Sequence, residues 1–198
     1  MIKEVLKRMH FFDNVERKTI SLEIAKIPNN PRTVRRASFS IDGVEYVPYS
    51  ESHIVLYPVD GGISFSFSGC AMAYFTVDGF ANIAHICLTG AGNEYDCRDI
   101  WNEKVNSGEY QNVKLFYPAT DSLMGLLCSE YEKRKKQVPP DKLFNICGYI
   151  SPDDQHCYSA LIDLERKCVI AEEEHQPYNG SAACLIPVIK VKNHSVQI

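Results

Sequence analysis

Two Asp-Gly pairs, each lying between two short apolar runs, constrain the fold of this chain more than any other feature. They are Asp42-Gly43 and Asp78-Gly79. Asp-Gly is favoured in the two-residue turns of β-hairpins, because both turn residues adopt positive φ there. The two pairs therefore predict two antiparallel hairpins, each formed by the apolar runs on either side of the pair.

Other apolar runs bounded by Gly, Pro or Asn indicate further strands. The strands we expect are residues 19–27, 33–40, 44–48, 53–57, 63–68, 70–77, 80–88, 113–117, 144–150, 157–164, 168–172 and 183–191. Helical spacing of apolar residues predicts helices within residues 1–12, 95–105 and 122–136. The expected fold class is α+β, with mostly antiparallel, β-sandwich-like sheets flanked by two or three helices. A length of 198 residues suits a single domain over residues 1–198.

Charge and hydropathy exclude some classes of partner. The net charge of -4 argues against a nucleic-acid partner, because phosphate contacts need clustered Lys and Arg. No run approaches the ~20 apolar residues that span a bilayer, and residues 1–12 lack the apolar core of a signal peptide. Most of the eight cysteines lie in apolar runs, which is typical of reduced, buried thiols. We therefore expect a cytoplasmic protein, and export by a specialised secretion system stays open.

The second hairpin contains the residues best suited to nucleophilic chemistry, Cys70 and His85. A cysteine nucleophile needs an adjacent base and an approachable sulfur, and Gly69 allows the backbone to come close to a bound carbonyl. Cys70 precedes Asp78 by eight residues, and His85 follows Gly79 by six. A hairpin register would place the thiol and the imidazole roughly opposite one another, within reach of a hydrogen bond.

A row of hydroxyl groups precedes this thiol. Ser64, Ser66 and Ser68 share the parity of Cys70, so all four side chains face the same way if Gly69 preserves the pleat. One of these serines could hold the second nitrogen of the imidazole, which is the orienting role of a third triad member. A β-bulge at Gly69 would break this relation.

Two further groups complete the expected site. The backbone N–H groups of Gly69 and Cys70 would stabilise an oxyanion formed on the substrate. The Gly-rich loop that follows the His85 strand would form the substrate rim, with Thr89, Gly90 and Asn93. This loop lacks the strand and helix context of a dinucleotide site and has no Walker lysine.

The run Phe67-Ser68-Gly69-Cys70, followed fifteen residues later by His85, resembles the cysteine–histidine protein glutamine deamidases. That superfamily includes the cytotoxic necrotizing factors, the Burkholderia lethal factor type and the CheD chemoreceptor deamidases. The resemblance covers residues 63–90. Members of the latter two kinds have Thr six residues before the Cys, where this chain has Ser64, and Phe67 stands where the toxins have Leu.

The resemblance implies a function and a fold. The implied activity is deamidation of a glutamine side chain in a protein substrate, without a cofactor, by a bacterial effector or toxin. Cys70 would be the nucleophile, His85 the base and acid, and Ser64 the third member. The implied fold, β-sandwich-like sheets flanked by helices, agrees with the strands expected from the residues.

Other interpretations of the same residues stay open. Cys70 and His85 could be ordinary core residues, and the serines could be the solvent face of an edge strand. His85, Cys87 and Cys97 could bind a metal, although structural zinc sites show paired C-x₂₋₄-C spacings that this chain lacks. The alternative functions are a non-enzymatic binding protein, such as a toxin-neutralising immunity protein, and a cysteine protease or transglutaminase.

Overall fold

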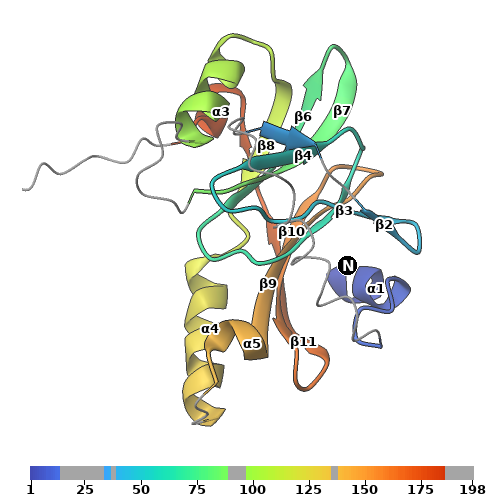
Figure 1. The fold of residues 1–198 in the computed structure, drawn as a ribbon, viewed down its shortest axis with the longest axis vertical. Helices are drawn as coiled ribbons and strands as arrows, with labels where there is room; N and C mark the ends of the chain where they lie inside the picture. The colour runs from blue at the N-terminus through green and yellow to red at the C-terminus, as the bar shows by residue number, and fades with distance from the viewer. Residues whose placement is uncertain (14–33, 37–38, 89–96, 135–137, 186–198) are drawn as a thin grey trace, which may run out of the picture.

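The computed structural model describes residues 1–13, 34–36, 39–88, 97–134 and 138–185. Two six-stranded sheets and four α-helices form this part of the chain (Figure 1). The predicted α+β class is therefore confirmed. The fourth helix, absent from the sequence expectation, has only four residues.

The first sheet contains the second predicted hairpin, in which His85 lies and which Cys70 directly precedes. In spatial order its strands are β1 (Val34–Arg36), β4 (Ile54–Tyr57), β7 (Phe80–Ile86), β6 (Ala71–Val77), β8 (Gln111–Phe116) and β12 (Tyr178–Asn179). All neighbouring pairs are antiparallel except β1 with β4.

The second sheet is built around the two long strands of the C-terminal half. Its spatial order is β11 (Cys168–His175), β10 (Cys157–Asp163), β9 (Phe144–Ile150), β5 (Gly62–Ser64), β3 (Val44–Tyr46) and β2 (Phe39–Ile41). Here only β3 and β5 run parallel.

The helices occupy the outside of the sheets. They are α1 (Ile2–Arg8), α3 (Cys97–Asn106), α4 (Asp121–Arg134), α5 (Pro140–Leu143) and the 3₁₀ turn η3 (Gly180–Ala183). In Figure 1, α3 lies at one end of the molecule beside the first sheet, and α4 and α5 lie at the other end. None of the helices in the described ranges is long and apolar enough to cross a membrane.

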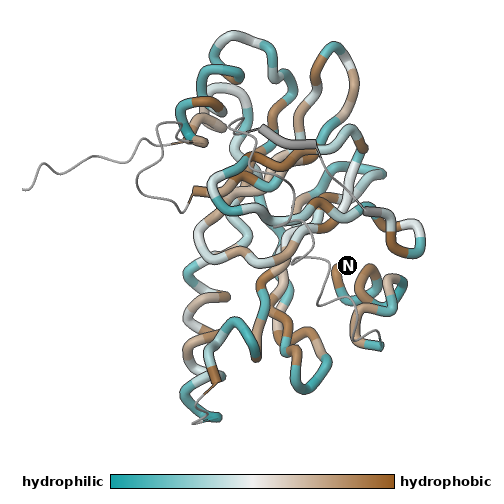
Figure 2. The backbone as a smooth tube through the Cα atoms, viewed as in Figure 1, coloured by the Kyte–Doolittle hydropathy of each residue, from teal (hydrophilic) through white to brown (hydrophobic). Residues whose placement is uncertain are grey.

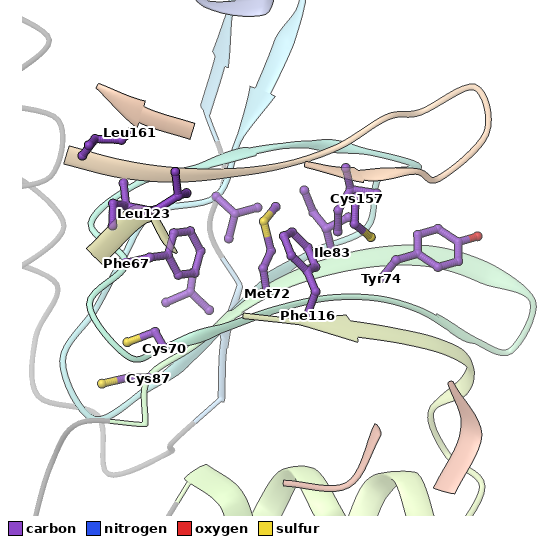
Figure 3. Close-up of a cluster of buried hydrophobic side chains, with 14 of the residues drawn as sticks. Phe67, Cys70, Met72, Tyr74, Ile83, Cys87, Phe116, Leu123, Cys157 and Leu161 are labelled. Atoms are coloured by element: carbon purple, nitrogen blue, oxygen red, sulfur yellow. The ribbon is translucent and has the colours of Figure 1, made fainter. Parts of the chain in front are cut away.

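Three groups of buried side chains show how the layers pack. The first lies between the sheets and joins Met72, Ile83 and Phe116 to Ile146 and Leu161 (Figure 3). The second lies on the other face of the first sheet under Trp101 of α3. The third lies on the other face of the second sheet under α1. Figure 2 shows hydrophobic residues along the strands and α1, whereas the far end of α4 is hydrophilic.

Both Asp-Gly pairs form the predicted hairpin turns. Asp42 and Gly43 have φ of 51° and 78°, and Asp78 and Gly79 have φ of 51° and 81°. Two positive φ values in succession define the turn that matches the twist of paired strands. The pairing of Val77 with Phe80 closes the second hairpin directly beside its turn.

Residues 63–77 differ from the expectation of two collinear strands. The chain leaves the second sheet at Ser64 and enters the first sheet at Ala71, so the alternating residues 63–68 do not form one strand. Ser66 and Gly69 have φ of 67° and 148°, which are turn conformations rather than strand conformations. Alternation alone does not reveal this crossing, because hydroxyl and apolar residues suit both sheets.

Two other predicted strands need comment. The strand expected over residues 183–191 is wrong at its start, because Ala183 ends the η3 turn, and residues 186–191 lie outside the described ranges. The strand expected over residues 19–27 also lies outside those ranges.

Candidate functional site

The chain crosses from the second sheet to the first between Ser64 and Ala71, and this crossing brings the Ser64 side chain against His85. From the sequence, the contact was expected for another reason, the alternation of side chains along a single strand. Ser64 ends β5 of the second sheet, and His85 lies in β7 of the first sheet. Both side chains are buried, and Ser64 Oγ lies 2.8 Å from His85 Nδ1. The serine that contacts the imidazole is therefore the one that the resemblance selected.

A second hydrogen bond of Ser64 fixes the protonation of the imidazole. Ser64 Oγ donates its proton to the carbonyl oxygen of Val47, which can only accept, at 2.5 Å. The hydroxyl oxygen must then accept from His85, so Nδ1 carries the ring proton. Nε2 is left as the unprotonated nitrogen, with a lone pair.

That lone pair is buried. Within the part of the chain that the structure describes, His85 Nε2 is a buried atom without a hydrogen-bond partner. Burial lowers the pKa of His85 to about 3, so the buried imidazole is neutral at physiological pH. An unpaired buried acceptor costs stability, and a catalytic role is one of the reasons for which native proteins retain one.

Two aromatic rings hold the imidazole in place. Phe67 stacks on His85, with ring centroids 4.1 Å apart and an interplanar angle of 4°. Tyr49 packs against another side of the ring, at 5.3 Å between centroids. Together with Ser64 these contacts restrict both the position and the rotation of the base.

Cys70 lies on the same side of the hairpin as His85, but not directly opposite it. His85 pairs with Met72, so Cys70, two residues earlier, occupies the diagonal position. Diagonal neighbours on one face are about 7–8 Å apart at Cα, which long or aromatic side chains span. Cys70, Met72 and Phe67 belong to the same buried group between the sheets (Figure 3).

The thiol is less exposed than the sequence suggested. Ser68 and Gly69 are exposed, whereas the side chain of Cys70 is only 1% exposed. The expectation of an accessible sulfur is therefore wrong, because the chain turns at Gly69 and Cys70 lies in the buried group between the sheets. The roles of the Gly69 and Cys70 N–H groups stay predictions.

Several contacts near the site were not predicted from the sequence, although Phe67 was part of the motif and Cys87 a possible metal ligand. Val47, Tyr49 and Phe67 position Ser64 and His85, but nothing in their spacing indicated that role. Cys87 had a clearer signal, since it lies two residues after His85 and so faces the same way. Cys87 Sγ accepts the N–H of Ser52 at 3.3 Å and lies 3.9 Å from Tyr49 Oη.

Two predictions remain, the substrate rim and the metal site. Thr89, Gly90 and Asn93 lie outside the described residues. His85, Cys87 and Cys97 do not form one group, because Cys97 packs with the α3 layer on the opposite face of the first sheet. No set of three metal-ligating side chains is gathered anywhere in the described ranges.

A second Cys–His pair provides a comparison. Cys157 pairs with His175 across β10 and β11, and Ser159 Oγ lies 2.6 Å from His175 Nε2. Burial raises the pKa of the Cys157 thiol to about 12, which disfavours a thiolate. In addition, the Ser159 hydroxyl contacts the Nε2 atom itself, whereas Nε2 of His85 has no such contact within the described ranges.

Comparison with protein-family models, with curated proteins and with solved structures gives no match to this chain.

Proposed function

We propose that this protein is a cysteine-dependent protein glutamine deamidase in which Cys70 and His85 act on a side-chain carboxamide. The observation that carries the proposal is the pair of hydrogen bonds at Ser64. Its hydroxyl donates to the Val47 carbonyl and accepts from His85 Nδ1. This arrangement leaves Nε2 as a lone-pair base on the face of the hairpin that holds the thiol. A thiol nucleophile needs such a base within hydrogen-bond reach. Nε2 makes no hydrogen bond among the described residues, so the proposal requires the Cys70 thiol to approach Nε2 when the site opens.

The chemical steps follow from these roles. His85 Nε2 takes the thiol proton, and the Cys70 thiolate attacks the carboxamide carbon of a glutamine. The C–N bond breaks as the imidazolium returns the proton to the leaving ammonia, which leaves a thioester on Cys70. Nε2 then takes a proton from water, the hydroxide attacks the thioester, and glutamate and the thiol are released.

The closed conformation must open for this reaction. Cys70 and His85 are each 1% exposed, so a substrate reaches them only after the residues that cover them move away. The segment 49–53 is the cover that the contacts favour, because Tyr49 packs on His85 and Ser52 donates its N–H to Cys87. Water and an adjacent thiolate in the open site both favour the imidazolium, so opening raises the pKa of His85 from its closed value.

The substrate proposed is a protein, and the proposed biological setting is a bacterial effector or toxin. Both follow from the resemblance to the deamidases. A protease or transglutaminase would use the same thioester, and only the attacked bond or the acceptor would differ.

A second candidate, a non-enzymatic binding protein such as an immunity protein, is favoured by one specific observation. Complete burial of Cys70 and His85 is what an ordinary core thiol and core histidine would show. A non-enzymatic binding protein should bind its partner unchanged when the Cys70 thiol is removed.

Heavy-oxygen water distinguishes the two candidates. The purified chain is incubated with a cell extract in this water, and new glutamate residues are sought by peptide mass spectrometry. We expect heavy oxygen in the side-chain carboxylate of particular former glutamines with the wild-type protein and none with Cys70→Ser. The control variant is Cys97→Ser, another buried cysteine, which should retain the activity.

The remaining outcomes are also informative. Amine-linked or cleaved products that depend on Cys70 would replace deamidation by transglutamination or proteolysis. Equal products with wild-type protein and Cys70→Ser, or no product from a folded wild-type protein, would refute the proposed function.

A further inference from the structure

We propose that Cys70 and Cys87 form a modification site, at which hydrogen peroxide produces a reversible intramolecular disulfide. The proposal about the disulfide stands on the geometry of the hairpin. Its consequence, reversible loss of activity, rests on the proposed function.

The register of the hairpin places these two cysteines as neighbours. Ala71 pairs with Ile86 at the open end of the β6–β7 hairpin. Cys70 directly precedes β6 and Cys87 directly follows β7, so continuation of the register by one residue sets them opposite one another. Opposite residues of an antiparallel pair have Cα atoms about 4.5–5.5 Å apart, which lies within the roughly 4.4–6.8 Å that a disulfide spans.

The side chains also lie on the same side. Both cysteines belong to the buried group between the sheets, with Phe67 and Met72. Figure 3 shows their sulfur atoms pointing to the same side at the end of the hairpin. Both are thiols in the structure, and Cys70 and Cys87 are 1% and 3% exposed.

The other sheet cysteines in the described ranges lack this relation. In the second sheet Cys147 pairs with Ala160, Cys157 with Ile150 and His175, and Cys168 with Asp163. Cys97 packs on the opposite face of the first sheet. The pairing of two thiols across adjacent strands is therefore a specific property of the candidate site.

The environment assigns a role to each sulfur. Both thiols share a face with His85, and the proposed function makes Cys70 the one that His85 deprotonates, so Cys70 meets the oxidant first. Cys87 accepts the N–H of Ser52, a contact that holds its sulfur in place at the hairpin end. Cys87 is then the resolving cysteine.

The reaction balances with one peroxide for two thiols. The Cys70 thiolate attacks one peroxide oxygen, the O–O bond breaks, and hydroxide leaves and takes the proton held by His85, which gives water and a sulfenic acid. Cys87 attacks the Cys70 sulfur, the S–O bond breaks, and the hydroxyl leaves as a second water with the Cys87 proton. Two thiols are oxidised by two electrons in total, and one peroxide is reduced to two waters.

The disulfide would inactivate the Cys70 nucleophile and at the same time protect it from irreversible oxidation. With its sulfur bonded to Cys87, Cys70 can neither attack a carboxamide nor proceed to the irreversible sulfinic acid. A thiol reductant would restore both groups.

The test treats the full chain with hydrogen peroxide, blocks the remaining thiols with N-ethylmaleimide, and maps cross-linked peptides without reduction. We expect one dominant cross-link, between the peptides that contain Cys70 and Cys87, and its loss after dithiothreitol. Absence of this link, or its appearance only after unfolding in urea, would overturn the proposal.

Two variants sharpen the result. In Cys87→Ser we expect Cys70 to accumulate as sulfinic acid, whereas the control Cys97→Ser should form the disulfide as the wild-type protein does. Equal accumulation of sulfinic acid at Cys70 in Cys87→Ser and wild-type protein would refute the resolving role. A disulfide that forms in a protein without deamidase activity would uphold this site and refute the proposed function instead.

Discussion

At the scale of single residues, Ser64 determines which nitrogen of His85 is protonated. Its hydroxyl bridges His85 Nδ1 and the Val47 carbonyl, so removal of one oxygen leaves two buried polar groups unsatisfied. The residue pattern left Ser64, Ser66 and Ser68 open, and the resemblance to the deamidases pointed to Ser64, six positions before Cys70. The sequence could not show Val47 as the second partner, because that contact depends on how the two sheets pack.

Substitution of Ser64 should therefore reduce both stability and reactivity. We expect Ser64→Ala to lower the free energy of unfolding by ~1–3 kcal/mol, since each unsatisfied buried group carries a desolvation cost. It should also slow alkylation of Cys70, because the imidazole loses its fixed orientation.

Urea unfolding and timed alkylation measure these two effects, and Ser64→Thr is the matched control because it keeps the hydroxyl. Wild-type stability in Ser64→Ala would show that the bridge contributes nothing to the fold.

The burial of His85 makes a prediction about pH. The folded-state pKa of His85 is lowered to about 3, below its ordinary value of 6.5, so the unfolded chain binds the proton more readily. Its contribution to stability is complete above the unfolded pKa and is lost as pH falls from about 6.5 toward 3. From pH 7 to about pH 4 this loss amounts to roughly 3 kcal/mol.

The comparison is between wild-type protein and His85→Asn, whose amide retains a donor for Ser64 but does not titrate. The stability difference between them, measured by urea unfolding across this range, isolates His85 from the other titrating groups. A difference independent of pH would mean that the imidazole is not buried in the neutral form.

At the scale of elements, the hairpin β6–β7 was the most predictable part of the site. Asp78-Gly79 specified the turn, and a two-residue turn pairs Val77 with Phe80. Counting outward from that pair gives Met72, not Cys70, as the residue opposite His85. The expected opposition was therefore two residues out of register, although the shared face was correct.

Gly79 tests how strongly the turn stabilises the hairpin. A Cβ at Gly79 would meet no atom within 4 Å, but its φ of 81° is unfavourable for any other residue. We expect Gly79→Ala to lower the free energy of unfolding by about 1 kcal/mol, because L-residues avoid this region.

The matched control is Gly125→Ala on α4, where a Cβ would also meet no atom within 4 Å. There the helical backbone suits alanine, and we expect a gain of roughly 1 kcal/mol. Changes of the same sign in both variants, measured by urea unfolding, would contradict this account of the turn.

At the scale of the whole molecule, close approach of the two sheets forms the site. A Cβ on Gly148 of β9 would lie 2.8 Å from Met72 Sδ and 3.3 Å from Phe67 Cε2, so the glycine lets the layers meet beside His85. Local patterns predict strands and turns, whereas this contact joins residues far apart in the chain. That is why Val47 and Tyr49 could not be recognised from the sequence.

The relative alkylation rates of the eight cysteines test the central claim, that His85 activates Cys70, most directly. Limited iodoacetamide labelling at about pH 6, where ordinary thiols are almost wholly protonated, is read by peptide mass spectrometry. We predict that Cys70, although buried, reacts faster than the exposed Cys128 and Cys168, and that His85→Asn removes this advantage. Slower labelling of Cys70 than of Cys128 and Cys168 in the folded wild-type protein would contradict the claim.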